Sequence, residues 1–145
     1  MIHFIVVHCS ATPPGMDIGA DEIRKWHVEK NGWRDIGYND VIRRDGSLEA
    51  GRAYGETLAH ATGFNSNSVA VCLVGGVSDH GAPQANFQKA QFDTLRIWIA
   101  FMQAKYPGAK LRGHRDLPNV NKDCPCFDVQ HWFNTGNIRD ERKPS

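Results

Sequence analysis

The chain of 145 residues carries 41% hydrophobic and 23% charged residues and a formal net charge of +1. These fractions are typical of a one-domain globular protein and exclude a disordered or fibrous chain. The nearly neutral charge gives no reason to expect a nucleic-acid or membrane-surface partner. No apolar run approaches the roughly 18 residues that span a bilayer, and the first residues lack the basic start of a signal peptide. We therefore expect synthesis in a reducing cytoplasm and no insertion into a membrane.

The first half of the chain contains two predicted buried strands. At residues 3–8, β-branched residues stand together before the turn-forming segment CSATPPG, which predicts a strand. Residues 17–32 carry apolar side chains at three- and four-residue spacing and end in glycine, which predicts a helix. Residues 38–52 are typical of a hairpin whose turn is RDGS. Residues 68–76 are predicted to be the second buried strand, ended by a glycine pair.

The second half contains the longest predicted helix. A loop at residues 77–86 precedes an amphipathic helix at 87–106, which a Pro-Gly pair ends. A last short strand is predicted at residues 109–114 and a short closing helix at 127–133. From Thr135 onward we expect a polar, frayed tail.

Strands alternate with helices along the chain, which predicts a single α/β domain over residues 1–145. The hairpin adds antiparallel pairing, so we expect a central mixed β-sheet flanked by helices. Active sites in open α/β sheets lie at strand ends and in the loops that leave them. The residues best suited to chemistry fall in those places.

Two histidines and a cysteine occupy such positions. His8 closes the first strand, His114 closes the last, and Cys124 follows in a loop. Two imidazoles and a thiolate suit a zinc ion that keeps its fourth position open for chemistry. Spacing alone leaves another interpretation open, in which the histidines are satisfied strand-end residues and Cys124 is a buried thiol. Neighbouring strand residues face opposite ways, so Cys9 should point away from a site that contains His8.

The four cysteines do not form a convincing disulfide framework. Such frameworks belong to small secreted domains with tighter cysteine spacing. Cys9 and Cys72 lie in apolar strands and are expected to be small core residues. Cys124 and Cys126 stand two residues apart in NKDCPCFD, and a disulfide between them would remove Cys124 as a ligand.

Three further polar residues have two interpretations each. Tyr38 either packs with a satisfied hydroxyl or turns that hydroxyl into the cleft. Lys122 is solvated by default, but a ligating Cys124 would hold its ammonium near the metal, where it would stabilise an oxyanion. His60 stands in a polar loop and either lines the same cleft or lies on the surface.

Other conspicuous side chains are interpreted as structural. The remaining inner histidines are expected to be structural or solvent-facing: His27, His80 and His131. The tryptophans are expected in the core: Trp26, Trp33, Trp98 and Trp132. The arginines of the hairpin are expected on its solvated face: Arg43, Arg44 and Arg52.

Six segments together resemble a known family: VVHCSAT, GADEIRKWHVEKNGWRDIGYNDVIRRDGSLEAGR, NSVAVCLVGG, ANFQKAQFDTLR, LRGHRDL and KDCPCFDVQHW. In order and spacing they are similar to the zinc-dependent N-acetylmuramoyl-L-alanine amidases of the type 2 amidase family, and most to its small phage endolysins. The resemblance runs over nearly the whole chain. It implies hydrolysis of the amide between the lactyl group of N-acetylmuramic acid and L-alanine in peptidoglycan.

The resemblance also implies a metal site with one zinc ion per chain. In that family a first-strand histidine, a histidine at the end of a late strand and a following cysteine bind zinc. Those positions are occupied here by His8, His114 and Cys124. Cys126 has no counterpart role in the family.

The family's catalytic pair is matched as well. Its tyrosine in a GY pair falls on Tyr38, and its lysine two residues before the cysteine falls on Lys122. Its loop histidine falls on His60, which we expect to help bind the substrate. Many relatives carry a histidine directly after the tyrosine, where Asn39 stands here, which implies a different fit to the substrate.

Two rival functions come with the resemblance. The eukaryotic peptidoglycan recognition proteins are similar, and those without the cysteine ligand bind murein without cutting it, so the presence of Cys124 favours the enzyme. Some phage relatives also bind the phage RNA polymerase, partly through an N-terminal extension that this chain lacks before its first strand. The missing extension argues against this second function here, and the polymerase is kept only as a second candidate partner. We expect a monomer that acts on the cell wall during host lysis.

Overall fold

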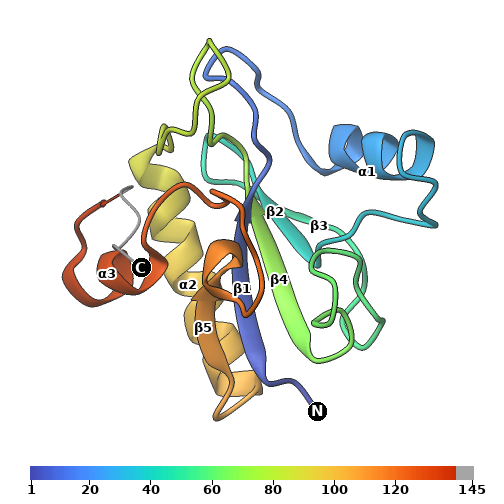
Figure 1. Ribbon diagram of the computed structural model, residues 1–145. Helices are drawn as coiled ribbons and strands as arrows, with labels where there is room; N and C mark the ends of the chain where they lie inside the picture. The colour runs from blue at the N-terminus through green and yellow to red at the C-terminus, as the bar shows by residue number, and fades with distance from the viewer. Residues whose placement is uncertain (140–145) are drawn as a thin grey trace.

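In the computed structural model, residues 1–139 are described. Along this part, strands and helices alternate as the sequence predicts (Figure 1). In chain order the elements are β1 (Phe4–Cys9), α1 (Ala20–Glu29), β2 (Asp40–Ile42), β3 (Leu48–Ala50), β4 (Ser68–Leu73), α2 (Lys89–Lys105), β5 (Lys110–Gly113), the 3-10 turn η1 (His114–Asp116) and α3 (Val129–Thr135).

The strands form one five-stranded sheet in the order β3-β2-β4-β1-β5. β1 pairs in parallel with β4 and β5, and β2 pairs in parallel with β4, while β3 runs antiparallel to β2. The antiparallel pair is the predicted hairpin, with its turn between Ile42 and Leu48. The expected mixed α/β sheet is therefore confirmed, and its parallel strands all end at one edge.

The side chains of β1 divide between the two faces of this sheet because successive strand residues point opposite ways. Ile5 and Val7 join the main core cluster, which α2 and α3 cover. Val6 points to the other face, where it packs against Ala61 and Leu117 from two loops. His8 has the same orientation as Val6, so it points to the face that the loops cover.

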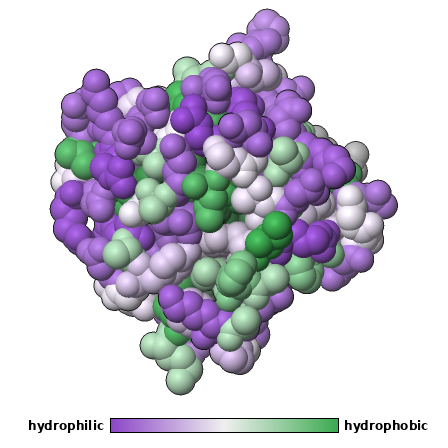
Figure 2. Space-filling view, turned by 180° about the vertical axis from the view of Figure 1, so that it is seen from behind, coloured by the Kyte–Doolittle hydropathy of each residue, from purple (hydrophilic) through white to green (hydrophobic). Residues whose placement is uncertain are grey.

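Helix α2 packs an apolar stripe against the sheet, as its periodicity predicts. Leu95 and Ile99 are fully buried there, and Met102 lies beside them. The outer side of the helix is less polar than expected, because Ile97 and Phe101 are exposed. Seen from behind, the molecule shows apolar residues gathered near its middle (Figure 2). Within residues 1–139 no helix combines the length and apolarity needed to cross a membrane.

Helix α1 is shorter than predicted, and its start has a tertiary cause. The expected helix covered residues 17–32, whereas α1 begins at Ala20. The N–H of Gly19 donates to the carboxylate of Glu22 at 2.9 Å, and the N–H of Ala20 donates to Glu49 in β3 at 2.8 Å. These carboxylates satisfy N–H groups that a helix leaves without internal partners.

The closing segment continues further than expected. The predicted tail began at Thr135, but this residue is the last of α3, and Gly136 follows in the left-handed conformation that ends helices. The guanidinium of Arg139 then binds the carboxylate of Asp128 at 2.6 Å. Residues 140–145 of the expected tail lie outside the described part of the chain.

Candidate active site

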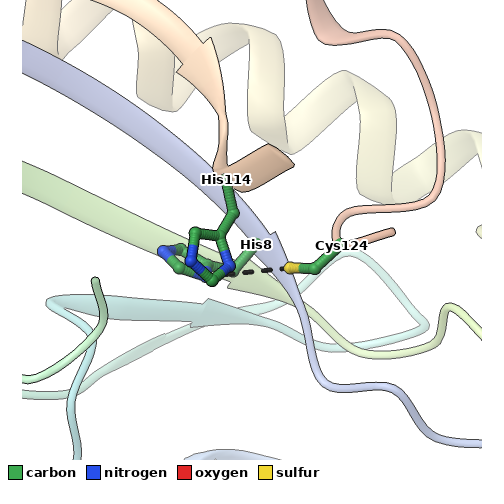
Figure 3. A group of neighbouring side chains, drawn as sticks. All are labelled: His8, His114 and Cys124. Atoms are coloured by element: carbon green, nitrogen blue, oxygen red, sulfur yellow. Dashed lines mark hydrogen bonds between the residues drawn. The ribbon is translucent and has the colours of Figure 1, made fainter. Parts of the chain in front are cut away.

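Two histidines meet at the edge where the parallel strands end. β1 and β5 are neighbours in the sheet, and Val7 is in register with Gly113. The residue after Val7 is His8, and the residue after Gly113 is His114, which begins η1 directly at the end of β5. The ring centroids of these two histidines are 4.4 Å apart. Cys124 comes from the loop before α3 and points its Sγ at this pair, 3.7 Å from Nδ1 of His8 (Figure 3).

These three residues fit a tetrahedral metal ion. Their candidate ligand atoms all lie within 4.8 Å of one another. In a zinc site with bonds of about 2.0 to 2.3 Å, ligand atoms are separated by roughly 3.3 to 3.8 Å, so small side-chain rotations would suffice. Three protein ligands, two imidazoles and a thiolate, leave one coordination position open, as catalytic zinc sites require.

Both imidazoles are held in the form that binds metals. Burial, followed by the proximity of His60 and His114, lowers the pKa of His8 well below its usual value. Burial, followed by the charge of Lys122, lowers the pKa of His114 to about 4. At neutral pH both rings are therefore neutral, with a lone pair available for a cation.

A chain of hydrogen bonds fixes the orientation of His8. The Ser68 hydroxyl donates to the carbonyl of Phe64 at 2.5 Å, so its oxygen accepts from Nε2 of His60 at 2.6 Å. Nδ1 of His60 is then the acceptor, and Nε2–H of His8 donates to it at 2.7 Å. This assignment leaves the lone pair of Nδ1 of His8 facing Cys124.

The thiol of Cys124 also has a defined environment. The backbone N–H of Cys9 donates to Sγ of Cys124 at 3.2 Å. The side chain of Cys9 was expected to point away from the site, but its thiol interacts with the thiols of both Cys124 and Cys126, and its Sγ lies 4.0 Å from that of Cys126. All four cysteines are free thiols, and Cys9, Cys72 and Cys126 are buried. Cys124 is therefore not lost to a disulfide with Cys126.

Tyr38 lies against His8. Its ring centroid is 4.9 Å from that of His8, and the side chain is half-buried. Burial, followed by the thiols of Cys72 and Cys124, raises the pKa of the Tyr38 phenol well above its usual value. The phenol consequently keeps its proton at neutral pH and can donate a hydrogen bond.

An open cleft lies beside the cluster. Its volume is about 840 Å³, and His60, His114 and Lys122 contribute to its lining. Lys122 is exposed, and it lies close enough for its charge to lower the pKa of both His8 and His114. A ligand in this cleft would therefore meet a cation next to the candidate metal site.

One of the tryptophans interpreted as structural has a different environment. Trp33 was expected in the core, but it lines the cleft and packs on His27 with a centroid distance of 4.7 Å. Its position shortly before Gly37-Tyr38 in the chain was the available signal. Trp98 and Trp132 are core residues as predicted.

The prediction for Arg52 was wrong. It was expected on the solvated face of the hairpin, yet it is only 5% exposed. Its guanidinium donates to backbone carbonyls rather than facing water. The other two arginines of the hairpin, Arg43 and Arg44, are partly exposed, as expected.

Two neutral imidazoles and a thiol thus lie together beside an open cleft, and this donor set suits a metal ion. The family model described as N-acetylmuramoyl-L-alanine amidase matches residues 1–127, and the chain belongs to this family. It is 49% identical over 129 residues to the endolysin of Escherichia phage T7, an alignment that covers 89% of this chain and 83% of the relative. The protein is thus an N-acetylmuramoyl-L-alanine amidase of the endolysin kind, and its substrate is peptidoglycan.

Solved structures share the fold. The Ph2119 endolysin of a Thermus scotoductus bacteriophage is 27% identical with a TM-score of 0.72, covering 86% of this chain and 77% of that one. PGRP-SA of the bumblebee, at 22% identity, has a TM-score of 0.75 and covers 92% of this chain and 81% of that one. Amidases and peptidoglycan recognition proteins therefore have the same architecture as this chain.

Proposed function

We propose that this amidase is a zinc enzyme in which His8, His114 and Cys124 hold the ion. The supporting observation is the convergence of three ligand atoms within 4.8 Å, together with the hydrogen bonds that orient His8 and Cys124. When bound, zinc supplies a Lewis acid and an activated water at neutral pH. The bond cut is the amide between the lactyl group of N-acetylmuramic acid and L-alanine.

Lys122 would stabilise the negative charge that develops on the scissile carbonyl oxygen. Its ammonium lies on the lining of the cleft beside His114. A positioned cation of this kind acts more strongly on the transition state than on the neutral substrate amide. Lys122 is therefore the proposed electrostatic catalyst.

Tyr38 would act through its neutral hydroxyl. The raised pKa of the phenol keeps the proton on its oxygen, so the group donates a hydrogen bond rather than carrying a charge. Directed at the reacting oxygen atoms, this donor would orient the nucleophile and stabilise the tetrahedral intermediate.

We assign His60 a role different from the substrate contact expected from the sequence. Its Nδ1 accepts from His8 and its Nε2 donates to Ser68, so both ring nitrogens are engaged within the protein. Partners of this kind hold a metal-ligating histidine in one orientation and one tautomer. His60 would therefore support the metal site, although its ring also borders the cleft.

The experiment that tests the zinc proposal compares two neighbouring cysteines. Wild-type protein and the variants Cys124→Ser and Cys126→Ser are purified under reducing conditions. Zinc per chain is measured, and purified murein is assayed for newly exposed alanine amino groups. We expect about one zinc per chain and full activity in wild type and in Cys126→Ser, and loss of both in Cys124→Ser.

Each alternative outcome is informative. Stoichiometric zinc without cleavage in the wild-type protein would favour a murein-binding module. Activity that survives in zinc-free protein would contradict the proposed metal dependence. The monomeric state, release to the wall without a signal peptide, and the phage RNA polymerase as a second partner stay predictions from the sequence.

A further inference from the structure

The segment that carries Tyr38 is held by a buried arginine from the hairpin. Nε of Arg52 donates to the carbonyl of Ile36 at 2.8 Å, and its Nη2 donates to the carbonyl of Asp35 at 3.0 Å. The backbone N–H of Arg52 donates to the carbonyl of Tyr38 itself at 2.7 Å. One residue therefore binds three of the four carbonyls between positions 35 and 38.

The same guanidinium also reaches the loop of His60. Nη1 of Arg52 donates to the carbonyl of Thr57 at 2.7 Å. Further along that loop, the N–H of Ala59 donates to the carbonyl of Gly37 at 3.3 Å. Arg52 thus links the segment that carries Tyr38 to the segment that carries His60.

The linked segments approach so closely that their separation is fixed. A Cβ atom on Gly37 would lie 2.0 Å from the carbonyl oxygen of Ala59, so only glycine fits there. The N–H of Gly37 donates to Nδ1 of His27 at 3.0 Å on the other side. The planar guanidinium satisfies carbonyls that would otherwise be left without partners in this tight packing.

The hydrogen bonds that hold this segment continue at Asn39, directly after Tyr38. Its side-chain oxygen accepts from the N–H of Ala70 in β4 at 2.9 Å, and its side-chain nitrogen donates to the carbonyl of Arg52 at 3.1 Å. Tyr38 therefore has a fixed neighbour on each side, because Asn39 is bound to β4 and to Arg52 and Gly37 is bound to His27 and Ala59.

We propose that Arg52 is a positioning residue of the amidase, which holds the phenol of Tyr38 against His8 by binding the carbonyls of Asp35, Ile36 and Thr57. The proposal rests on the catalytic role proposed above for Tyr38. Arg52 has no hydrogen bond to the candidate metal ligands and does not line the cleft, so its effect on the reaction passes through the two segments that it binds. An unchanged zinc content in Arg52→Ala separates the segment of Tyr38 from the segment of His60. A misplacement of about 1 Å at a catalytic group can lower the rate by roughly 100-fold.

The test is a double-mutant cycle on murein hydrolysis with Arg52→Ala, Tyr38→Phe and the combined variant. Arg43→Ala is the matched control, because Arg43 lies on the same hairpin with its side chain partly exposed and paired to Asp17 and Glu49. We expect Arg52→Ala to lower kcat by about 100-fold, with a smaller change in KM and unchanged zinc content. In the double variant the loss should be no greater than in Tyr38→Phe alone, because both changes remove the same contribution.

Two further measurements show whether Arg52 positions Tyr38 or only stabilises the whole fold. Added guanidinium, at concentrations that leave the wild-type protein folded and active, should restore part of the activity of Arg52→Ala but none of that of Tyr38→Phe. Hydrogen exchange should be faster at residues 35–39 in Arg52→Ala, while β1 and β4 keep their protection. In Arg43→Ala, both the rate of murein hydrolysis and the rate of hydrogen exchange at residues 35–39 should equal those of wild type.

The outcomes distinguish this proposal from the one on which it rests. Full activity in Tyr38→Phe would overturn the role of Tyr38. An impaired Tyr38→Phe together with a fully active Arg52→Ala would overturn the role of Arg52 alone. Additive losses in the double variant, or equally fast exchange throughout the protein, would show that Arg52 only stabilises the fold.

Discussion

On one face of the sheet, Ile5 and Val7 of β1 meet apolar side chains of α2 and α3. On the other face, His8 of the same strand meets a histidine, a tyrosine and a thiol supplied by loops. The first face is held by close packing of apolar atoms, whereas on the second the apolar packing of Val6 gives way at His8 to directed hydrogen bonds between polar groups. Alternation along a single strand therefore keeps His8 apart from the main core that Ile5 and Val7 join.

The largest expected effect on stability lies on the helix-covered face. Ile99→Ala removes a fully buried side chain of α2 and should lower the free energy of unfolding by about 2 to 5 kcal/mol. Ile97→Ala, on the same helix but 61% exposed, should change it by less than about 0.5 kcal/mol. Urea denaturation measures both. At temperatures where both variants are folded, the rate of murein hydrolysis per folded molecule should equal that of wild type. A lower rate in Ile99→Ala would show that the helix-covered face also contributes to catalysis.

On the loop-covered face the expected effect is on rate. Lys122→Met should lower kcat by about 10² to 10³-fold, the usual cost of losing one donor to a developing oxyanion. The melting temperature should stay the same, because the Lys122 side chain is exposed. Lys89→Met on α2 is the control with full activity. A marked fall in melting temperature in Lys122→Met would show that this residue supports the fold.

A smaller effect is expected at His60. His60→Ala removes the acceptor for Nε2–H of His8 and should weaken zinc binding by about 10 to 100-fold. Competition with a chromophoric chelator measures the dissociation constant. His80→Ala, an exposed histidine, should bind zinc as wild type does. Unchanged zinc affinity in His60→Ala, with a raised KM for murein, would return His60 to the substrate-binding role predicted from the sequence.

The smallest effect concerns His27. Burial, followed by the charge of Arg52, lowers the pKa of His27 in the folded protein. The unfolded chain, whose histidines titrate near pH 6.5, therefore binds the proton more readily. The stability contributed by neutral His27 is present above that pH and decreases as the pH falls below it. His27→Asn keeps an acceptor for Gly37 and does not titrate, so its unfolding free energy should fall less between pH 7.5 and pH 5 than that of wild type. Equal slopes for the two proteins would contradict this prediction.

The fold could be predicted because its signals are local. Buried strands such as Ser68–Leu73 are continuous apolar runs, and the stripe of α2 repeats at helical spacing. The start of α1 could not be predicted, because one of the carboxylates that satisfies its first N–H groups comes from Glu49 in β3. Such a partner is distant in sequence and becomes a neighbour only when the sheet has formed.

The candidate site, like the fold, could be predicted from the sequence only in part. The histidines at the ends of two strands suggested a metal centre, and the structure brings both together with Cys124. The burial of Arg52 was missed because its partners are backbone carbonyls, which every residue has. Side-chain types therefore indicate a ligand set, whereas hydrogen bonds to the backbone leave no pattern in the sequence.

The distance along the chain between His8 and Cys124 has a consequence for biosynthesis. The two residues are 116 positions apart, so the ribosome synthesises one near the beginning of the protein and the other near the end. A nascent chain that stops before residue 124 contains both histidines but lacks the thiol. The complete donor set therefore arises only when translation is almost finished, and prematurely terminated products released into the cell should be inactive against peptidoglycan.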